Sequence, residues 1–234
     1  MIVGLLHPGE MGAAVGAAVH GDVIWASAGR SEETQRRASG FGDVGTVAAL
    51  VREADVILAI CPPHAALDVA RACTGFDGVY VDCNAVSPMR ASEIAALHPS
   101  FVDGGIIGGP PTEPGTTLYL SGDRAAGVAA LFDGSLLATR IVRDASAVKM
   151  AYAAWTKGTT ALLLAIREVA DRFGVEDEWR LAAPDLAERL PRAEAVAAKK
   201  GWRWVGEMEE IADTFTAAGA PEGFHRAAAE VYRR

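Results

Sequence analysis

The sequence predicts a doubly wound α/β domain over residues 1–143, followed by a smaller all-helical domain over residues 144–234. In the first part, short apolar runs alternate with helix-like stretches, a pattern that is typical of βαβ units. In the second part the chain is rich in alanine and leucine, and it has no strand-like run. A length of 234 residues is enough to bury the core that such a division needs.

The expected strands are near-continuous apolar runs, as in parallel sheets that are covered by helices on both faces. The strand over 54–61 ends at Pro62, because proline has no N–H group to donate to a neighbouring strand. Ser31 is placed to cap the helix-like stretch 31–39 through its hydroxyl. The expected strands lie at 1–6, 22–27, 54–61, 79–83, 101–107, 116–122 and 139–143.

Residues 144–173 predict one long helix, with Asp144 or Ser146 as its N-cap and Gly174 as its stop signal. Gly158 lies inside this stretch and would allow a kink, because glycine is a weak helix former. Further helices are expected over 178–199, 202–218 and 221–233, the last of them opened by Pro221.

The composition narrows the class of protein. With 22 basic and 30 acidic side chains the formal charge is −8, which argues against nucleic acid or an anionic membrane as a partner. The three cysteines have no metal-like spacing, so we expect no metal site and a reducing compartment. No leader or membrane-spanning pattern is visible, and we therefore expect a soluble, cytoplasmic protein.

The stretch GLLHPGEMG, residues 4–12, is close to the G-x-G-x-x-G turn of dinucleotide-binding domains. Gly9 would let the backbone approach a pyrophosphate, and Gly12 would let the following helix pack closely on the sheet. His7 replaces the first glycine of the motif. Because a residue before proline favours an extended backbone, we expect His7 to finish the strand and Pro8 to set the turn. The alternative is a plain strand–helix turn without a ligand.

Several segments resemble the β-hydroxyacid dehydrogenase family, which includes 6-phosphogluconate and 3-hydroxyisobutyrate dehydrogenases and, more distantly, imine reductases. The family opens with G-x-I-G-L-G-x-M-G, and Gly4, Gly9, Met11 and Gly12 fall in that register. ADVILAICPP, VDCNAVSP, DGGIIGGPP and ASAVKMAYAAWTKG continue the resemblance to about residue 172. The resemblance implies a Rossmann-type domain, a nicotinamide cofactor and the activity of an NAD(P)-dependent oxidoreductase.

The loop after the second strand indicates which nicotinamide cofactor to expect. It contains Arg30 and has no acid before Glu32, and Arg30 matches the arginine of the family's N-R-[ST] stretch. A carboxylate would bind the ribose 2′-OH of NAD, whereas a guanidinium flanked by hydroxyls suits the 2′-phosphate of NADP. We therefore expect NADP, with NAD as the alternative. The expected cofactor-binding residues are His7, Pro8, Gly9, Glu10, Met11, Ser27, Arg30, Ser31, Cys61, Pro62, Pro63 and Asn84.

The resemblance places the family's catalytic lysine at Lys149. A partly desolvated lysine near a cationic nicotinamide should have a lowered pKa, which suits acid–base chemistry near neutral pH. The alternative is a solvated helix lysine, but the flanking residues are apolar. Tyr152 shares the helix face with Lys149 and either serves the substrate or packs in a core.

The segment DGGIIGGPP corresponds to the family's D-[AG]-P-V-S-G-G, which supplies a serine and backbone N–H groups to a substrate carboxylate. Here Ile107 takes the serine position, while Gly108 and Gly109 remain as expected substrate-binding residues. We expect hydride transfer involving a small hydroxy acid or related carbonyl metabolite. The alternatives are an imine or ketone reductase for a less polar substrate, which the isoleucine favours, and a nucleotide-binding protein without turnover. The aliphatic long helix also suggests a homodimer.

Overall fold

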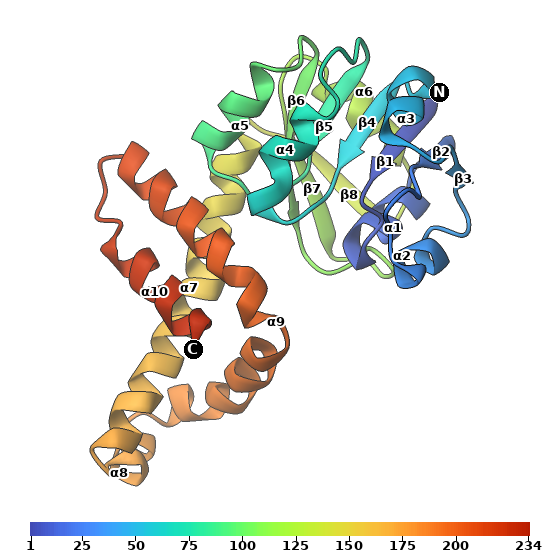
Figure 1. The fold of residues 1–234 in the computed structure, drawn as a ribbon. Coiled ribbons are helices and arrows are strands. Elements are labelled where there is room, and N and C mark those ends of the chain that lie inside the picture. The colour runs from blue at the N-terminus through green and yellow to red at the C-terminus, as the bar shows by residue number, and fades with distance from the viewer. The chain divides into compact units, whose positions relative to one another are not determined.

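The computed structural model describes all 234 residues, which form two compact units, Met1–Lys149 and Met150–Arg234. The first unit is an eight-stranded sheet with helices, and the second is helical (Figure 1). Helix α7 (Ala145–Arg172) begins in the first unit and continues as the first helix of the second. The predicted order of an α/β region followed by a helical region is confirmed.

The first unit contains every strand of the chain and six of its α-helices. The strands are β1 (Ile2–Leu6), β2 (Asp22–Trp25), β3 (Gly42–Asp43), β4 (Val56–Ala59), β5 (Val79–Asp82), β6 (Phe101–Ile107), β7 (Thr116–Ser121) and β8 (Leu137–Ile141). The helices are α1 (Glu10–Ala17), α2 (Glu32–Arg37), α3 (Val47–Glu53), α4 (Ala66–Arg71), α5 (Pro88–Ala95) and α6 (Ala125–Ala129). Two short 3₁₀ turns are η1 (Pro63–Ala65) and η2 (Ala130–Phe132).

The strand order in the sheet is β3-β2-β1-β4-β5-β6-β7-β8. The chain runs outward from β1 to β3 and then returns to place β4 on the other side of β1, so the strand order reverses at the carboxyl ends of β1 and β4. In open α/β sheets, ligands bind in the crevice at this reversal.

The last two strands depart from the expected parallel sheet. Strand β7 pairs antiparallel with β6, and β8 pairs parallel with β7, so both run against the other six. The expected parallel arrangement is therefore confirmed for the six strands β1 to β6 and does not extend to this edge. Residues 108–115 connect β6 to β7 without a helix, and so short a connection returns the chain antiparallel, because a parallel partner needs a longer crossover.

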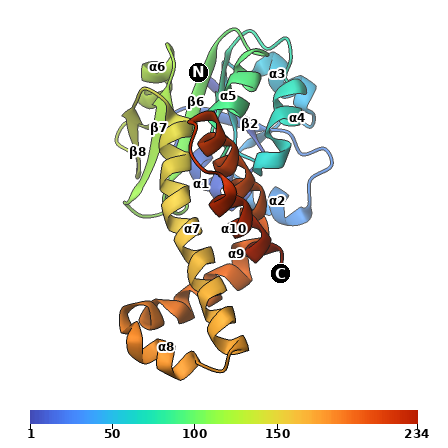
Figure 2. The ribbon, with the colours of Figure 1, turned by 90° about the vertical axis from the view of Figure 1, so that its left-hand side faces the viewer.

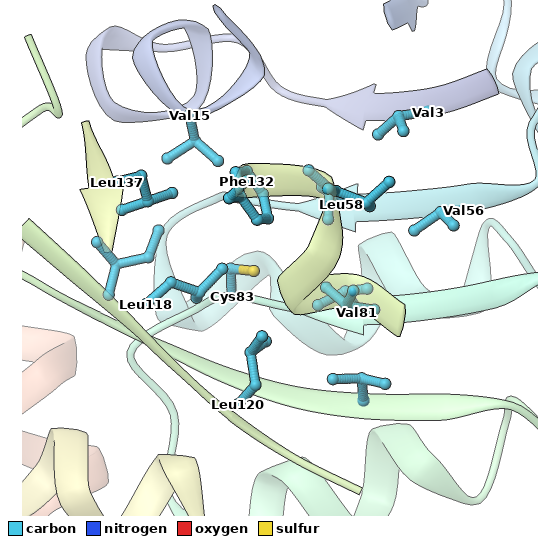
Figure 3. Packing of buried hydrophobic residues seen from close by; sticks show 14 of the residues in the cluster. Val3, Val15, Val56, Leu58, Val81, Cys83, Leu118, Leu120, Phe132 and Leu137 are labelled. Carbon is cyan, nitrogen blue, oxygen red and sulfur yellow. The ribbon is translucent and has the colours of Figure 1, made fainter. Parts of the chain in front are cut away.

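Both faces of the sheet are buried, as the apolar strands predict. Val3 and Leu5 of β1 belong to a cluster with Val15 of α1 and Phe132 of η2 (Figure 3). Leu6, next along the same strand, belongs to a second cluster. Successive strand residues point to opposite faces, so one apolar run supplies both cores.

The second core contains His98, whose ring stacks on Tyr80 with 4.0 Å between ring centroids. Its Nε2 donates to the carbonyl of Ala70 over 3.1 Å, and its Nδ1 is buried without a partner. Burial lowers the pKa of His98. The folded protein therefore holds this imidazole neutral at pH values at which the unfolded chain would protonate it.

We expect the free energy of unfolding to fall as the pH drops below about 6.5, because the unfolded chain then binds a proton that folded His98 resists. Replacing His98 with phenylalanine keeps the stacking and removes the titration. Urea unfolding at several pH values between 7.5 and 4.5 should give a shallower decline for His98→Phe. Parallel curves for the two proteins would contradict this expectation, whatever their offset.

The second unit consists of α7, α8 (Glu176–Ala182), α9 (Pro184–Ala217) and α10 (Gly223–Arg233), with α10 folded back along α9 (Figure 2). The prediction of separate helices over 178–199 and 202–218 is wrong, because α9 is continuous and the break falls at Ala183. Gly201 is buried in α9, and a Cβ there would lie 3.3 Å from the ring of Tyr232. This glycine makes room for α10 and does not end a helix.

Helix α7 runs through Gly158 and ends before Gly174, whose φ of 68° is typical of a helix stop, as predicted. None of the helices combines the length and the apolar character that spanning a membrane requires.

Candidate functional site

The turn after β1 has an unusual backbone. His7 has a φ of 65°, in the left-handed region that residues other than glycine rarely adopt, at a cost of about 1–2 kcal/mol. The prediction that His7 finishes the strand with an extended backbone is therefore wrong. The N–H of Gly9 donates to the carbonyl of His7 over 2.7 Å, which closes a tight turn around Pro8. Closing that turn overrides the preference that proline gives its predecessor, and the conformation is one that glycine adopts freely.

The two retained glycines have different local roles. A Cβ on Gly12 would lie 2.7 Å from the carbonyl oxygen of His7, so α1 can start this close to β1 only with glycine. A Cβ on Gly9 would meet nothing nearer than that same oxygen at 4.0 Å, so the space in front of Gly9 is open. Gly9 also precedes α1 without a side-chain cap, which leaves N–H groups of the first turn for another acceptor. The open space at Gly9 and these N–H groups together fit the pyrophosphate of a dinucleotide.

A cavity of about 240 Å³ lies beside this turn. Its lining is mostly apolar and contains one cation and one carboxylate. The carboxylate, Asp68, pairs with Arg71 at 3.1 Å, whereas the half-buried Arg30 has no carboxylate partner. Burial lowers the pKa of Arg30, because its charge is partly removed from water. The lining residues are Leu6, His7, Arg30, Val47, Ala65, Asp68, Val69 and Ala72.

His7 belongs to the wall of this cavity, and the Nδ1 atom of its imidazole is buried without a hydrogen-bond partner. Burial and the positive charge of Arg30 lower the pKa of His7 to about 4. The ring is therefore neutral near pH 7, with one N–H donor and one acceptor nitrogen.

Two hydrogen-bonding residues shape the β2–α2 loop. Ser31 caps α2 by accepting the N–H of Thr34 over 3.3 Å, as predicted. Ser27 donates its N–H to Asp43 over 3.3 Å, and Gly45 donates to the same oxygen over 2.8 Å. Hydrogen bonds from Ser27 and Gly45 hold the pKa of Asp43 below its usual value. The sequence did not indicate this role for Asp43, because β3 is only two residues long and gives no strand pattern.

The segments after β4 and β5, which contain predicted cofactor residues, are joined by a hydrogen bond. Asn84 accepts the N–H of Cys61 over 2.5 Å and donates from Nδ2 to the carboxylate of Asp82. Burial raises the pKa of the Cys61 thiol to about 12, so it is protonated at neutral pH. Pro62 and Pro63 follow and open η1. Asn84 thus fixes the start of the β4–α4 segment, and its contact with a cofactor stays a prediction.

The structure brings Lys149 to the segment predicted to bind substrate. Its Nζ donates to the carbonyl of Ile106 over 2.7 Å, next to Ile107 at the end of β6. Gly108 follows with a φ of 129°, and a Cβ there would lie 2.4 Å from the hydroxyl oxygen of Thr116. That hydroxyl donates to the carbonyl of Gly109 over 2.6 Å, so the two glycines hold the start of this loop against β7.

The first turn of α7 is fixed to β6 at a second point. The carboxylate of Asp103 accepts the N–H of Ser146 over 2.8 Å and its hydroxyl over 2.6 Å, and the hydroxyl of Ser121 over 3.1 Å. Burial raises the pKa of Asp103. A Cβ on Gly105 would lie 3.0 Å from that of Lys149, so glycine sets the spacing between strand and helix. Sequence analysis missed Asp103, although an acid inside an apolar strand was a visible signal.

Two further predictions concern α7. Of the two predicted N-caps, Asp144 fills the role, because its carboxylate accepts the N–H of Ala147 over 2.7 Å. Tyr152 belongs to the second unit, and the residue is 46% exposed. The structure does not show Tyr152 packed in a core.

Sequence comparison finds two matches. Residues 170–234 match a family described as a domain of unknown function, DUF1932. A relative from Methanothermus fervidus, described as an uncharacterized 28.5 kDa protein in the 7S RNA 5′ region, is 32% identical over 158 residues. The aligned part is 64% of this chain and spans 62% of the length of that curated relative.

Comparison with solved structures covers the whole chain. A conserved protein of unknown function, described as structurally similar to 3-hydroxyacid dehydrogenases, is 25% identical with a TM-score of 0.72, and the match covers 100% of this chain and 97% of that one. A 3-hydroxyisobutyrate dehydrogenase from Mycobacterium tuberculosis shares the fold at 16% identity and a TM-score of 0.67, and the match covers 99% of this chain and 92% of that one.

A reductive aminase from Aspergillus terreus, solved with an NADPH-type cofactor, cyclohexanone and allyl amine, shares the fold at 14% identity and a TM-score of 0.59. That match covers 98% of this chain and 92% of the aminase. The full-length structural likeness shows the fold of the 3-hydroxyacid dehydrogenases, and it supports the resemblance to the β-hydroxyacid dehydrogenase family that the sequence motifs indicate.

Proposed function

We propose that this protein is an NADP(H)-dependent oxidoreductase that acts on a small hydroxy acid or a related carbonyl metabolite. The observation that carries the proposal is Arg30, a half-buried cation without a carboxylate partner in the wall of a mainly apolar cavity. Such a cavity suits an aromatic base, and its cation suits a phosphate. The open cradle at Gly9 supports a pyrophosphate beside it.

The proposed cofactor would supply or accept the hydride when bound. The chain's own residues would hold it: the α1 turn at the pyrophosphate, Arg30 at the 2′-phosphate and the segment from Cys61 to Pro63 along the crevice. The fold relative from Aspergillus terreus was solved with NADPH, which supports the cofactor class.

Lys149 would move the proton. A hydroxyl that loses hydride must also lose a proton, and a carbonyl that gains hydride must gain one. The Nζ of Lys149 is the group that the structure brings to the end of β6, where its bond to Ile106 orients it. We therefore propose Lys149 as the general acid and base, with Tyr152 as a further contact to substrate.

A second candidate is an imine or ketone reductase for a less polar substrate. Ile107 favours it, because this side chain offers no hydrogen bond to a carboxylate at the end of β6. The backbone N–H groups of Gly108 and Gly109 would remain for a polar substrate. An imine reductase from Pseudomonas sp. shares the fold at 18% identity and a TM-score of 0.55.

Replacing Arg30 with alanine should raise the dissociation constant of NADPH about 10- to 100-fold, since a charge-assisted hydrogen bond contributes roughly 1.5–3 kcal/mol. The dissociation constant of NADH should change less than about threefold, because NADH lacks the 2′-phosphate. Fluorescence titration measures both. Arg52→Ala, an exposed arginine on α3, is the matched control and should change neither value. An NADPH preference that survives Arg30→Ala would overturn this role for Arg30.

A further inference from the structure

His7 occupies a backbone conformation that glycine would adopt with less strain. Its left-handed backbone is strained for any residue with a side chain, and glycine is the residue that the dinucleotide motif usually has there. The turn itself needs only the backbone of His7, whose carbonyl accepts the N–H of Gly9. Backbone strain of this kind concentrates at functional sites, so the imidazole is the part of His7 that calls for an explanation.

The surroundings of the imidazole suggest what it binds. It shares the cavity wall with Arg30, and its Nδ1 is buried without a partner. The other ionisable side chain in the cavity wall is Asp68, which pairs with Arg71. The thiol of Cys61 interacts with Arg30 and is protonated at neutral pH. No carboxylate of the chain offsets Arg30. Because Nδ1 is enclosed, the neutral ring would present its Nε2–H to an incoming ligand. An oxyanion would satisfy both groups.

We propose that His7 is a specificity residue that recognises, together with Arg30, the phosphomonoester on the adenosine ribose of the dinucleotide. The inference rests on the proposed NADP(H) function and extends it to a second residue. The apolar walls of the cavity take the base, Arg30 supplies charge, and the neutral imidazole supplies a directed hydrogen bond. The chain thus uses the first position of the glycine motif for selection of the cofactor.

The test compares 2′,5′-ADP with 5′-AMP, which differ only in the 2′-phosphate, by calorimetric titration of the full chain. His7→Gly removes the ring and suits the left-handed backbone, so it should fold at least as well as the wild type. We expect it to bind 2′,5′-ADP about tenfold more weakly and 5′-AMP within twofold of the wild type. His7→Asn tolerates the same backbone and keeps a side-chain donor, so it should recover part of the loss.

The outcomes separate this inference from the proposed function. If the wild type prefers 2′,5′-ADP and His7→Gly keeps the full preference, the role of His7 is wrong and the NADP(H) function stands. If the wild type shows no preference for 2′,5′-ADP, both the NADP(H) function and the role of His7 are wrong. An equal loss for both nucleotides in His7→Gly would indicate a damaged turn and would also overturn the specificity role. The melting temperature of His7→Gly, expected at or above that of the wild type, checks that the turn is intact.

Discussion

Replacing Lys149 with methionine should lower kcat about 10²- to 10⁴-fold, the usual contribution of a positioned acid–base group. Methionine keeps an unbranched side chain of similar length and removes the ammonium that donates to Ile106. Binding of NADPH should stay within about threefold of the wild type, because the cavity at Arg30 lies on other elements. The measurement is NADPH formation from NADP⁺ with hydroxy acids and NADPH consumption with ketones and cyclic imines, which also identifies the substrate class.

Two controls show what the lysine contributes. Lys149→Arg keeps a positive charge and a donor but does not release its proton at neutral pH, so it should stay as inactive as Lys149→Met. Lys199→Met, an exposed lysine on α9, should retain the wild-type rate. Recovery of activity in Lys149→Arg would show that charge alone matters, and an active Lys149→Met would remove Lys149 from the mechanism.

Much of the first unit could be predicted because its signals are local. An apolar run bounded by proline indicates a buried strand, as over 54–61, and a serine before a polar stretch indicates a helix cap, as at Ser31. The direction of β7 was not visible in its own residues. The signal lay in residues 108–115, which are too few for a crossover helix.

The errors and omissions share one physical cause. The conformation of His7 follows from closing a turn between a strand and a helix, whereas the proline rule describes an isolated dipeptide. Asp103 acts on Ser146, which lies 43 residues further along the chain, so no window of sequence shows the contact. The family resemblance predicts the role of Lys149, but its hydrogen bond to Ile106 is likewise a tertiary contact that no local sequence window shows.

The second unit contains a buried ion pair between Lys157 of α7 and Glu207 of α9. The two side chains are only 17% and 9% exposed. The ammonium also lies 5.6 Å from the ring centroid of Trp204, and the hydroxyl of Tyr232 donates to the backbone carbonyl of Lys157 over 2.6 Å. The pair therefore sits where three helices of this unit meet, and its charges are largely shielded from water.

Replacing Lys157 with methionine should lower the free energy of unfolding by about 3–5 kcal/mol, since it breaks a buried ion pair by removing one partner. For a chain of this length the melting temperature should fall by roughly 6–20 °C. Arg172→Met is the matched control, because Arg172 pairs with Glu168 on the surface, and it should cost less than about 1 kcal/mol.

The double variant Lys157→Met/Glu207→Leu distinguishes the charge from the packing. Two apolar side chains of similar size replace a buried pair at little cost, so this variant should regain more than half of the lost stability. Urea unfolding of the wild type, Lys157→Met, Glu207→Leu and the double variant measures the coupling directly. A Lys157→Met variant as stable as the surface control would show that water reaches Glu207, and the pair would then count as a surface interaction. If the double variant is as unstable as Lys157→Met alone, the loss comes from the packing around Trp204 and Tyr232, because the buried carboxylate has by then been removed.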